Sequence, residues 1–181
     1  MHTQLKTIFN FIAFQIGWFS CVIFAAKGLP EYGITIAVLM LVANALQLDK
    51  PLNSLRLIVA VSLLGFTWDS FLTAYDVFVF HSGVMLDFLA PSWIVMMWLI
   101  FSSTLTVSFR WLYGRYLLAV VLGAIVGPLA YFGGAALGAV KIPQPGLAIV
   151  FLSAGWAVLM PLMIKLAEVF EQLNTEVVSD E

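Results

Sequence analysis

The chain has 181 residues, of which 62% are hydrophobic and 10% charged, with a mean hydropathy of +1.04 and a net charge of −2. Soluble domains carry about 25% charged residues, so this composition excludes an ordinary soluble domain. The small net charge provides no basic patch for nucleic acid, and the single cysteine, Cys21, excludes an internal disulfide.

The charged residues separate long uncharged runs of 17 to 25 residues, and the run between Arg56 and Asp76 is interrupted only by Asp69. An α-helix needs ~20 apolar residues to cross a hydrocarbon core of ~30 Å. The pattern therefore predicts an all-α, polytopic membrane protein, a compact bundle of six transmembrane helices. The predicted helices cover residues 8–26, 33–48, 55–75, 92–109, 116–139 and 146–164.

The first run also has some features of a signal peptide, because Lys6 precedes an apolar stretch that ends in small residues. A signal peptide's apolar region usually has 7–15 residues, and the stretch 8–26 is longer. Asn10, Gln15 and Trp18 within it suit a packed helix. We expect this segment to be retained as the first helix.

The basic residues predict the orientation of the bundle. Cytoplasmic loops carry an excess of Lys and Arg. One side of the predicted bundle holds Lys6, Lys50, Arg56, Arg110, Arg115 and Lys165, and the other holds Lys27 and Lys141. Both termini are therefore expected in the cytoplasm, with a single transmembrane domain over residues 1–170 and an acidic cytoplasmic tail over 171–181 that extends the last helix.

The segment 76–91, between the third and fourth helices, is apolar and is expected on the outer side. β-Branched and aromatic residues flank a turn at Ser82 and Gly83, a pattern that predicts a short hairpin. A re-entrant or interfacial helix is the alternative. The segment then acts either as loop packing or as a functional lid.

The third predicted helix carries the most informative chemistry, since Ser62, Asp69 and Asp76 are spaced by seven and share one face. A carboxylate at the bilayer centre costs ~2.5–3.5 kcal/mol. Asp69 should therefore face the bundle interior, near Tyr131 or Trp156, and be paired or protonated. It is either a structural hydrogen-bond acceptor for Tyr131 or a catalytic acid, base or ion site. Asp76 is expected at the outer interface, with a structural role favoured.

A second polar set lies toward the cytoplasmic side and has two interpretations. Interhelical hydrogen bonds in membranes average ~0.6 kcal/mol and commonly hold helices together. The alternative is a polar pocket open to the cytoplasm, with arginines at its rim to meet an anionic headgroup. The candidate residues are Asn10, Gln15, Asn44, Gln47, Thr104 and Ser108, with Arg110 and Arg115 at the rim.

The fifth predicted helix is irregular. The pairs Gly123/Gly127 and Gly134/Gly138 have the four-residue spacing that lets helix backbones approach closely in lipid. Pro128 removes a backbone donor and is expected to kink the helix. Helix packing is the first interpretation, and a kinked helix beside a transport cavity is the second.

No motif for a metal, a cofactor or a nucleophile is present. The two histidines, His2 and His81, belong to no metal-ligand spacing, and the sequence has no nucleophile elbow, phosphate loop or dinucleotide fingerprint. We therefore expect no metal and no cofactor.

Three groups of residues together resemble a known family over nearly the whole chain. They are Phe9-Asn10-Phe11 with Phe14-Gln15-x-Gly17-Trp18, then Pro91-x-Trp93 with Trp98 and Thr104-Leu105, and Gly127-Pro128-x-x-Tyr131 with Gly133-Gly134. This pattern is similar to the bacterial inner-membrane family called domain of unknown function 2878. The resemblance implies a location in the bacterial cytoplasmic membrane. Because genes of this family neighbour ones resembling cyclopropane-fatty-acid synthases and flavin-dependent oxidases, it also implies, by association, a role in fatty-acid or phospholipid modification or in membrane stress.

Three hypotheses about function follow. The first is a non-enzymatic small carrier or accessory subunit, and the second is a membrane-embedded lipid-modifying enzyme that uses Asp69. The third is a structural subunit that binds neighbours through the small residues of the fifth helix. The expected partners are the lipid bilayer, a lipid or small apolar ligand, and a membrane-protein partner or a second copy of the chain.

Overall fold

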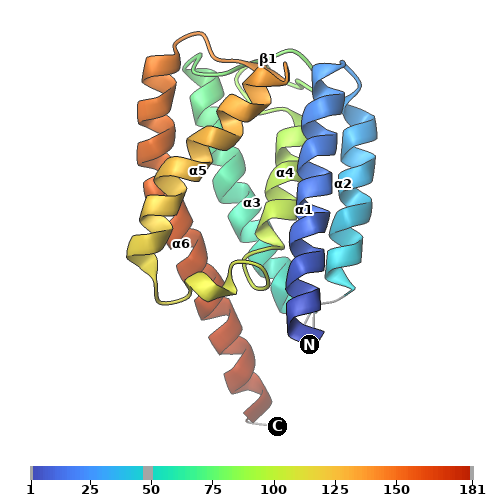
Figure 1. The fold of residues 1–181 in the computed structure, drawn as a ribbon, viewed down its shortest axis with the longest axis vertical. Helices are drawn as coiled ribbons and strands as arrows, with labels where there is room; N and C mark the ends of the chain where they lie inside the picture. Colours follow the sequence, from blue (N-terminus) through green and yellow to red (C-terminus); the bar gives the residue numbers. More distant parts are fainter. Residues whose placement is uncertain (1, 47–50, 180–181) are drawn as a thin grey trace.

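The computed structural model describes residues 2–46 and 51–179 and confirms the all-α class (Figure 1). Two short strands and one turn of 3-10 helix accompany six α-helices in this part of the chain. The helices are α1 (His2–Ala26), α2 (Pro30–Ala45), α3 (Pro51–Ala74), α4 (Ser92–Ser102), α5 (Tyr116–Ala136) and α6 (Pro145–Ser179). The strands are β1 (Val79–Phe80) and β2 (Val140–Lys141), and the 3-10 turn is η1 (Arg110–Leu112).

The bundle is built from two helix pairs with α3 and α4 between them. α1 packs along α2 and α5 packs along α6, while α4 contacts α1, α2 and α3, and α3 contacts α6. Figure 1 shows both chain termini at one end of the bundle and the two strands at the other. These are called the terminal end and the strand end below. α6 extends beyond the other helices at the terminal end (Figure 1), so the predicted acidic tail continues the last helix as far as Ser179.

Four of the helices are long and apolar enough to cross a membrane: the segments Gln4–Ala26, Ser54–Ala74, Tyr116–Ala136 and Pro145–Gln172. The other two, α2 and α4, are apolar but have only 16 and 11 residues. At ~1.5 Å per residue they reach only ~24 Å and ~17 Å. The structure thus shows a protein with membrane-like helices, whereas the prediction of six transmembrane helices is not confirmed.

α4 ends at Ser102 rather than at residue 109, and the reason lies in three successive hydroxyl residues. Ser102 Oγ donates to the Trp98 carbonyl (2.6 Å), Ser103 Oγ to the Ile100 carbonyl (2.7 Å), and Thr104 Oγ1 to the Phe101 carbonyl (2.6 Å). Hydroxyl groups that bond nearby carbonyls compete with the helical backbone bonds. The chain continues through turns to η1, so Thr104 and Ser108 do not share a helix face as predicted.

The segment between α3 and α4 forms neither the predicted hairpin nor a re-entrant helix. β1 pairs instead with β2, the link between α5 and α6, with Val79 opposite Lys141 and Phe80 opposite Val140 in antiparallel register. Residues 81–91 contain no helix and no strand. The hairpin prediction assumed that β1 pairs with a neighbouring segment of the chain. Its actual partner is β2, which follows α5 in the sequence.

Three helices end at the strand end in the same way. α1, α3 and α5 are each followed by a residue in the left-handed region: Gly28 (φ 74°), Asp76 (φ 54°) and Gly138 (φ 88°). In each case the next residue's N–H bonds the carbonyl five residues earlier, the pattern of a Schellman motif. The donor–acceptor pairs are Leu29 to Phe24 (2.9 Å), Val77 to Leu72 (2.9 Å) and Ala139 to Gly134 (3.0 Å).

Candidate functional site

Asp69 lies fully buried in the last third of α3, with both carboxylate oxygens hydrogen-bonded. Trp98 of α4 donates its indole N–H to Oδ2 at 2.7 Å, and the Tyr131 hydroxyl of α5 donates to Oδ1 at 2.6 Å. The side chain therefore faces the bundle interior beside Tyr131, as predicted from its position in an apolar run. Trp98 is a partner that the sequence analysis did not predict, because a tryptophan in an apolar run is equally consistent with core packing.

Aromatic rings enclose this carboxylate. Trp98 stacks on Trp156 of α6, with centroids 5.3 Å apart and planes at 14°. Tyr131 stacks on Phe78, which precedes β1, with centroids 5.0 Å apart and planes at 4°. Gly65, one turn before Asp69, leaves the space for Trp98, since a Cβ there would lie 2.0 Å from the indole. The carboxylate thus lies in a closed aromatic layer that joins four helices.

The second polar set gathers at the terminal end around the turns that follow α4. The buried Asn10 side chain donates to the Ser103 carbonyl at 3.2 Å and accepts from Ser108 Oγ at 2.6 Å. Asn44 donates to Ser103 Oγ at 3.2 Å, and the single Ser108 hydroxyl hydrogen has a second available acceptor, the Thr7 carbonyl, at 3.1 Å. These bonds tie α1 and α2 to residues 103–108, which is the helix-joining role that the sequence analysis favoured.

A small cavity lies in this region, where the sequence predicted a polar pocket. Its volume is about 20 Å³, and Lys6, Asn10, Asn44 and Val107 line it. A cavity of ~10–15 Å³ or more has room for one water molecule. Asn44 Oδ1 has no hydrogen-bond partner among the described residues and is the acceptor available there.

The remaining polar candidates are dispersed. Gln15 is only half-buried, Thr104 bonds the carbonyl of Phe101 within its own turn, and Gln47 lies outside the described residues. Asp76 is exposed and caps α3. Structure and prediction therefore agree on Asp69, Asn10, Asn44 and Ser108 as interior groups but not on a single pocket that contains them.

Arg110, predicted at the rim for an anionic headgroup, is paired within the chain. Its guanidinium lies 2.5 Å from the Glu171 carboxylate of α6. Tyr113, three residues later, is close to the same carboxylate, and burial together with Glu171 raises the pKa of its hydroxyl. Glu168, one turn before Glu171, accepts hydrogen bonds from Tyr116 and Lys165. These contacts hold the link between α4 and α5 against α6.

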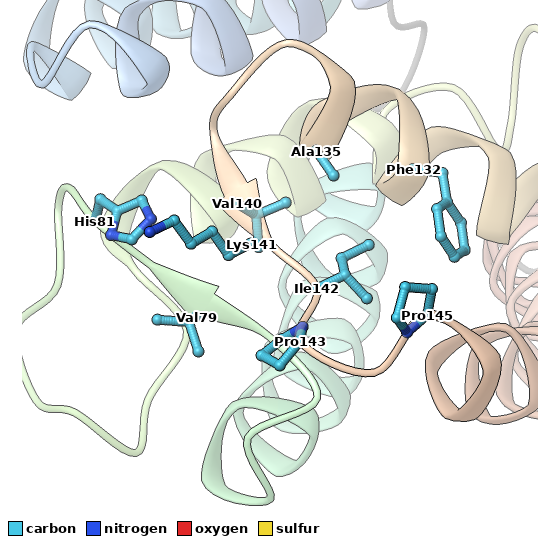
Figure 2. A pocket seen from close by; sticks show the side chains of 9 residues that line it. All are labelled: Val79, His81, Phe132, Ala135, Val140, Lys141, Ile142, Pro143 and Pro145. Atoms are coloured by element: carbon cyan, nitrogen blue, oxygen red, sulfur yellow. The ribbon is translucent and has the colours of Figure 1, made fainter.

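A shallow, open cavity lies at the strand end and was not anticipated from the sequence (Figure 2). Its volume is about 560 Å³, within the ~300–1,000 Å³ of small-molecule sites. Most of the exposed surface in it is apolar, and two polar side chains, His81 and Lys141, lie at one edge. The lining residues are Val79, His81, Phe132, Ala135, Val140, Lys141, Ile142, Pro143 and Pro145. This set is called the strand-end pocket below.

The small residues of α5 pack mostly against α6. A Cβ on Gly123 would lie 2.3 Å from the Trp156 carbonyl oxygen, and one on Gly127 would lie 2.3 Å from the Trp156 ring. Pro128 is buried within the helix. Gly134 and Gly138 differ, because their nearest neighbours would lie at 3.9 Å and 3.8 Å. Gly138 also lies beyond the end of α5, where it forms the turn, so the second glycine pair is not a close helix-packing site.

No group of three or more His, Cys, Asp or Glu side chains able to hold a metal ion occurs among the described residues. No curated protein and no solved structure matches the chain. A family model does match, over residues 7–162, which covers α2 to α5 completely and most of α1. The chain therefore belongs to the family described as "Protein of unknown function (DUF2878)".

Proposed function

We propose that the chain is a non-enzymatic protein of the bacterial cytoplasmic membrane that binds a lipid or small apolar ligand in the strand-end pocket. It acts there as a small carrier or as an accessory subunit for fatty-acid or phospholipid modification. The observation that carries the proposal is the pocket itself, a volume of about 560 Å³ with an apolar lining. A pocket of this size and polarity suits an acyl chain better than a polar metabolite.

The proposal includes a six-span topology with the strand end outside and both termini in the cytoplasm. α2 is short by only a few residues of the ~20 that a span needs. α4 is continued along the chain by turns whose hydroxyls bond nearby carbonyls, so backbone polar groups there have partners inside the protein. The distribution of Lys and Arg supports this orientation.

The surroundings of Asp69 support a structural role for this residue rather than a catalytic one. Both of its oxygens already accept hydrogen bonds, it has no exposed surface, and it lines neither the strand-end pocket nor the small cavity near Asn44. A general acid or base must come within hydrogen-bond reach of its substrate. Gly123 and Gly127, likewise, already pack against α6 within one chain, so they do not favour a partner-binding role for α5.

Substituted-cysteine labelling tests the topology. Cysteines placed at Ser82 and near the C-terminus, in a Cys21→Ala background, are expected to react with a membrane-impermeant maleimide from opposite sides of the membrane. Labelling of both positions from the same side contradicts the six-span arrangement.

A pocket-filling substitution tests the ligand site. Ala135→Trp places an indole within the pocket lining and is expected to abolish cross-linking of a photoactivatable fatty acid to the purified protein. Leu129→Trp, at a position on α5 that is 63% exposed, is the matched control and is expected to leave cross-linking unchanged. Equal cross-linking of the Ala135→Trp variant and the parent chain contradicts the proposed function.

A further inference from the structure

We infer that the strand-end pocket selects an anionic amphiphile, with the ligand's negative headgroup held by Lys141 and His81 and its acyl chain on the apolar lining. This inference rests on the proposed function and specifies the chemistry of its ligand.

The strand register places the two polar side chains together. Val79 lies directly opposite Lys141 in the antiparallel ribbon, and His81 follows Val79 by two residues. Directly opposite residues of a β-ribbon share a face, so Val79 and Lys141 lie on the same face. His81 follows directly after β1. Figure 2 shows the His81 ring beside the Lys141 side chain at one edge of the pocket.

The charge at this edge is not neutralised by any side chain that the structure describes. Lys141 is exposed and forms no ion pair with any described side chain. No acidic residue is among those that line the pocket. A Lys ammonium beside an apolar surface can therefore attract a carboxylate or phosphate, and the His81 ring N–H adds a directional donor.

The rest of the pocket is apolar. Phe132 and Ala135 of α5 form one wall, and Ile142 and Pro145 form the other (Figure 2). This apolar lining provides the surface for an acyl chain, while the headgroup is held at the charged edge.

Binding measurements with a panel of amphiphiles test the inference on the full-length protein in detergent micelles. The panel contains oleate, phosphatidylglycerol, zwitterionic phosphatidylcholine and uncharged monoolein, with binding followed by native mass spectrometry. The parent chain is expected to bind oleate or phosphatidylglycerol more tightly than the other two. The preferred member of that pair identifies the headgroup as a carboxylate or a phosphate.

Variants at Lys141 and His81 test the headgroup's contribution to binding separately from that of the acyl chain. Because hydrogen bonds to charged groups contribute ~1.5–3 kcal/mol, Lys141→Gln should weaken anionic binding by roughly tenfold or more. His81→Phe, which keeps a ring but removes the N–H, should weaken it by roughly threefold. Both should leave monoolein binding unchanged. Lys27→Gln removes an exposed Lys near the same end but outside the pocket, and it is the matched control.

Two results overturn the inference, and they are distinguishable. If anionic and uncharged amphiphiles bind equally and Ala135→Trp removes both, the pocket binds lipid without selecting charge, and only the present inference fails. If no amphiphile binds or if Ala135→Trp has no effect, the proposed function fails with it.

Discussion

The hydroxyl of Tyr131 donates to Asp69 Oδ1 at 2.6 Å and thereby connects α5 to α3 inside the aromatic layer. The second oxygen accepts from Trp98 of α4, so one carboxylate links three helices through two hydrogen bonds. Because Asp69 is fully buried, each of these bonds offsets part of the free energy needed to keep a carboxyl group away from water.

Tyr131→Phe is expected to destabilise the protein by roughly 1–3 kcal/mol, because it removes one of two donors to a buried acceptor while keeping the ring stacked on Phe78. The free energy of unfolding in mild detergent is the measurement. Tyr32→Phe, at a position on α2 that is 60% exposed, provides the control and is expected to have little effect. Equal stability of the two variants would show that the hydrogen bond is dispensable.

Asp69→Asn and Asp69→Leu are expected to differ strongly in their effect on stability. The amide of Asn keeps an acceptor for Trp98, so the fold should survive with a loss of about 1 kcal/mol. Leu leaves two buried donors unpaired, at a cost of roughly 2–6 kcal/mol. Thermal unfolding followed by near-ultraviolet circular dichroism measures both. A folded Asp69→Asn variant that has lost ligand binding would contradict a purely structural role.

Gly123→Ala is expected to destabilise the bundle much more than Gly134→Ala. The added Cβ at residue 123 would lie 2.3 Å from a backbone oxygen of α6, whereas at residue 134 its nearest neighbour is at 3.9 Å. Ala also favours a helix interior over Gly by ~1 kcal/mol, so Gly134→Ala should be neutral or stabilising. The midpoint of thermal unfolding in detergent distinguishes the two. A larger loss at residue 134 would contradict the packing described for α5 and α6.

The stability of variants at Asp76 is expected to depend on the backbone preference of the new residue rather than on its charge. Its φ of 54° is costly for most residues but not for Gly, and Asn tolerates it. Asp76→Gly and Asp76→Asn should therefore retain stability, while Asp76→Val should lose roughly 1–2 kcal/mol. Denaturant unfolding of the three variants measures the difference. Destabilisation by Gly and Asn as well would instead indicate that the carboxylate itself is needed.

Asn10→Leu should cost more stability than Asn44→Leu. Asn10 bonds both the Ser103 carbonyl and the Ser108 hydroxyl, so its loss removes two hydrogen bonds. Ser108 keeps the Thr7 carbonyl as an acceptor, whereas the Ser103 carbonyl loses its Asn10 donor, at roughly 1–3 kcal/mol. Asn44 makes one bond, to a hydroxyl that also donates to a carbonyl, and its own oxygen is already without a partner among the described residues. The free energies of unfolding of the Asn10→Leu and Asn44→Leu variants test this order.

Physical arguments about a single residue in an apolar run predicted its position in the structure correctly. The free energy of burying a carboxylate predicted that Asp69 faces inward, and its estimated depth predicted Tyr131 as one of two candidate neighbours, with Trp156 as the other. The apolar runs predicted all six helices, although α4 is shorter than its run. Its early end depends on which carbonyls three successive hydroxyls bond, and hydropathy does not contain that information.

The contacts that the sequence could not predict join segments distant along the chain. β1 and β2 have two residues each, too few for an alternating pattern to reveal them. The strand-end pocket depends on that pairing, so His81 and Lys141 gave no local signal of being neighbours. Trp98 was missed for a similar reason, because a tryptophan in an apolar run fits core packing as well as it fits hydrogen bonding to a carboxylate.

The pairing of β1 with β2 also fixes an order of assembly. The ribosome produces β1 before α4 and α5, and its partner strand follows only after α5 has been made. The ribbon and the pocket that it borders therefore close late in synthesis, because contacts between distant segments must await the intervening chain. A nascent chain arrested before residue 140 would carry α1 to α5 without this closure, with β1 still lacking its partner strand.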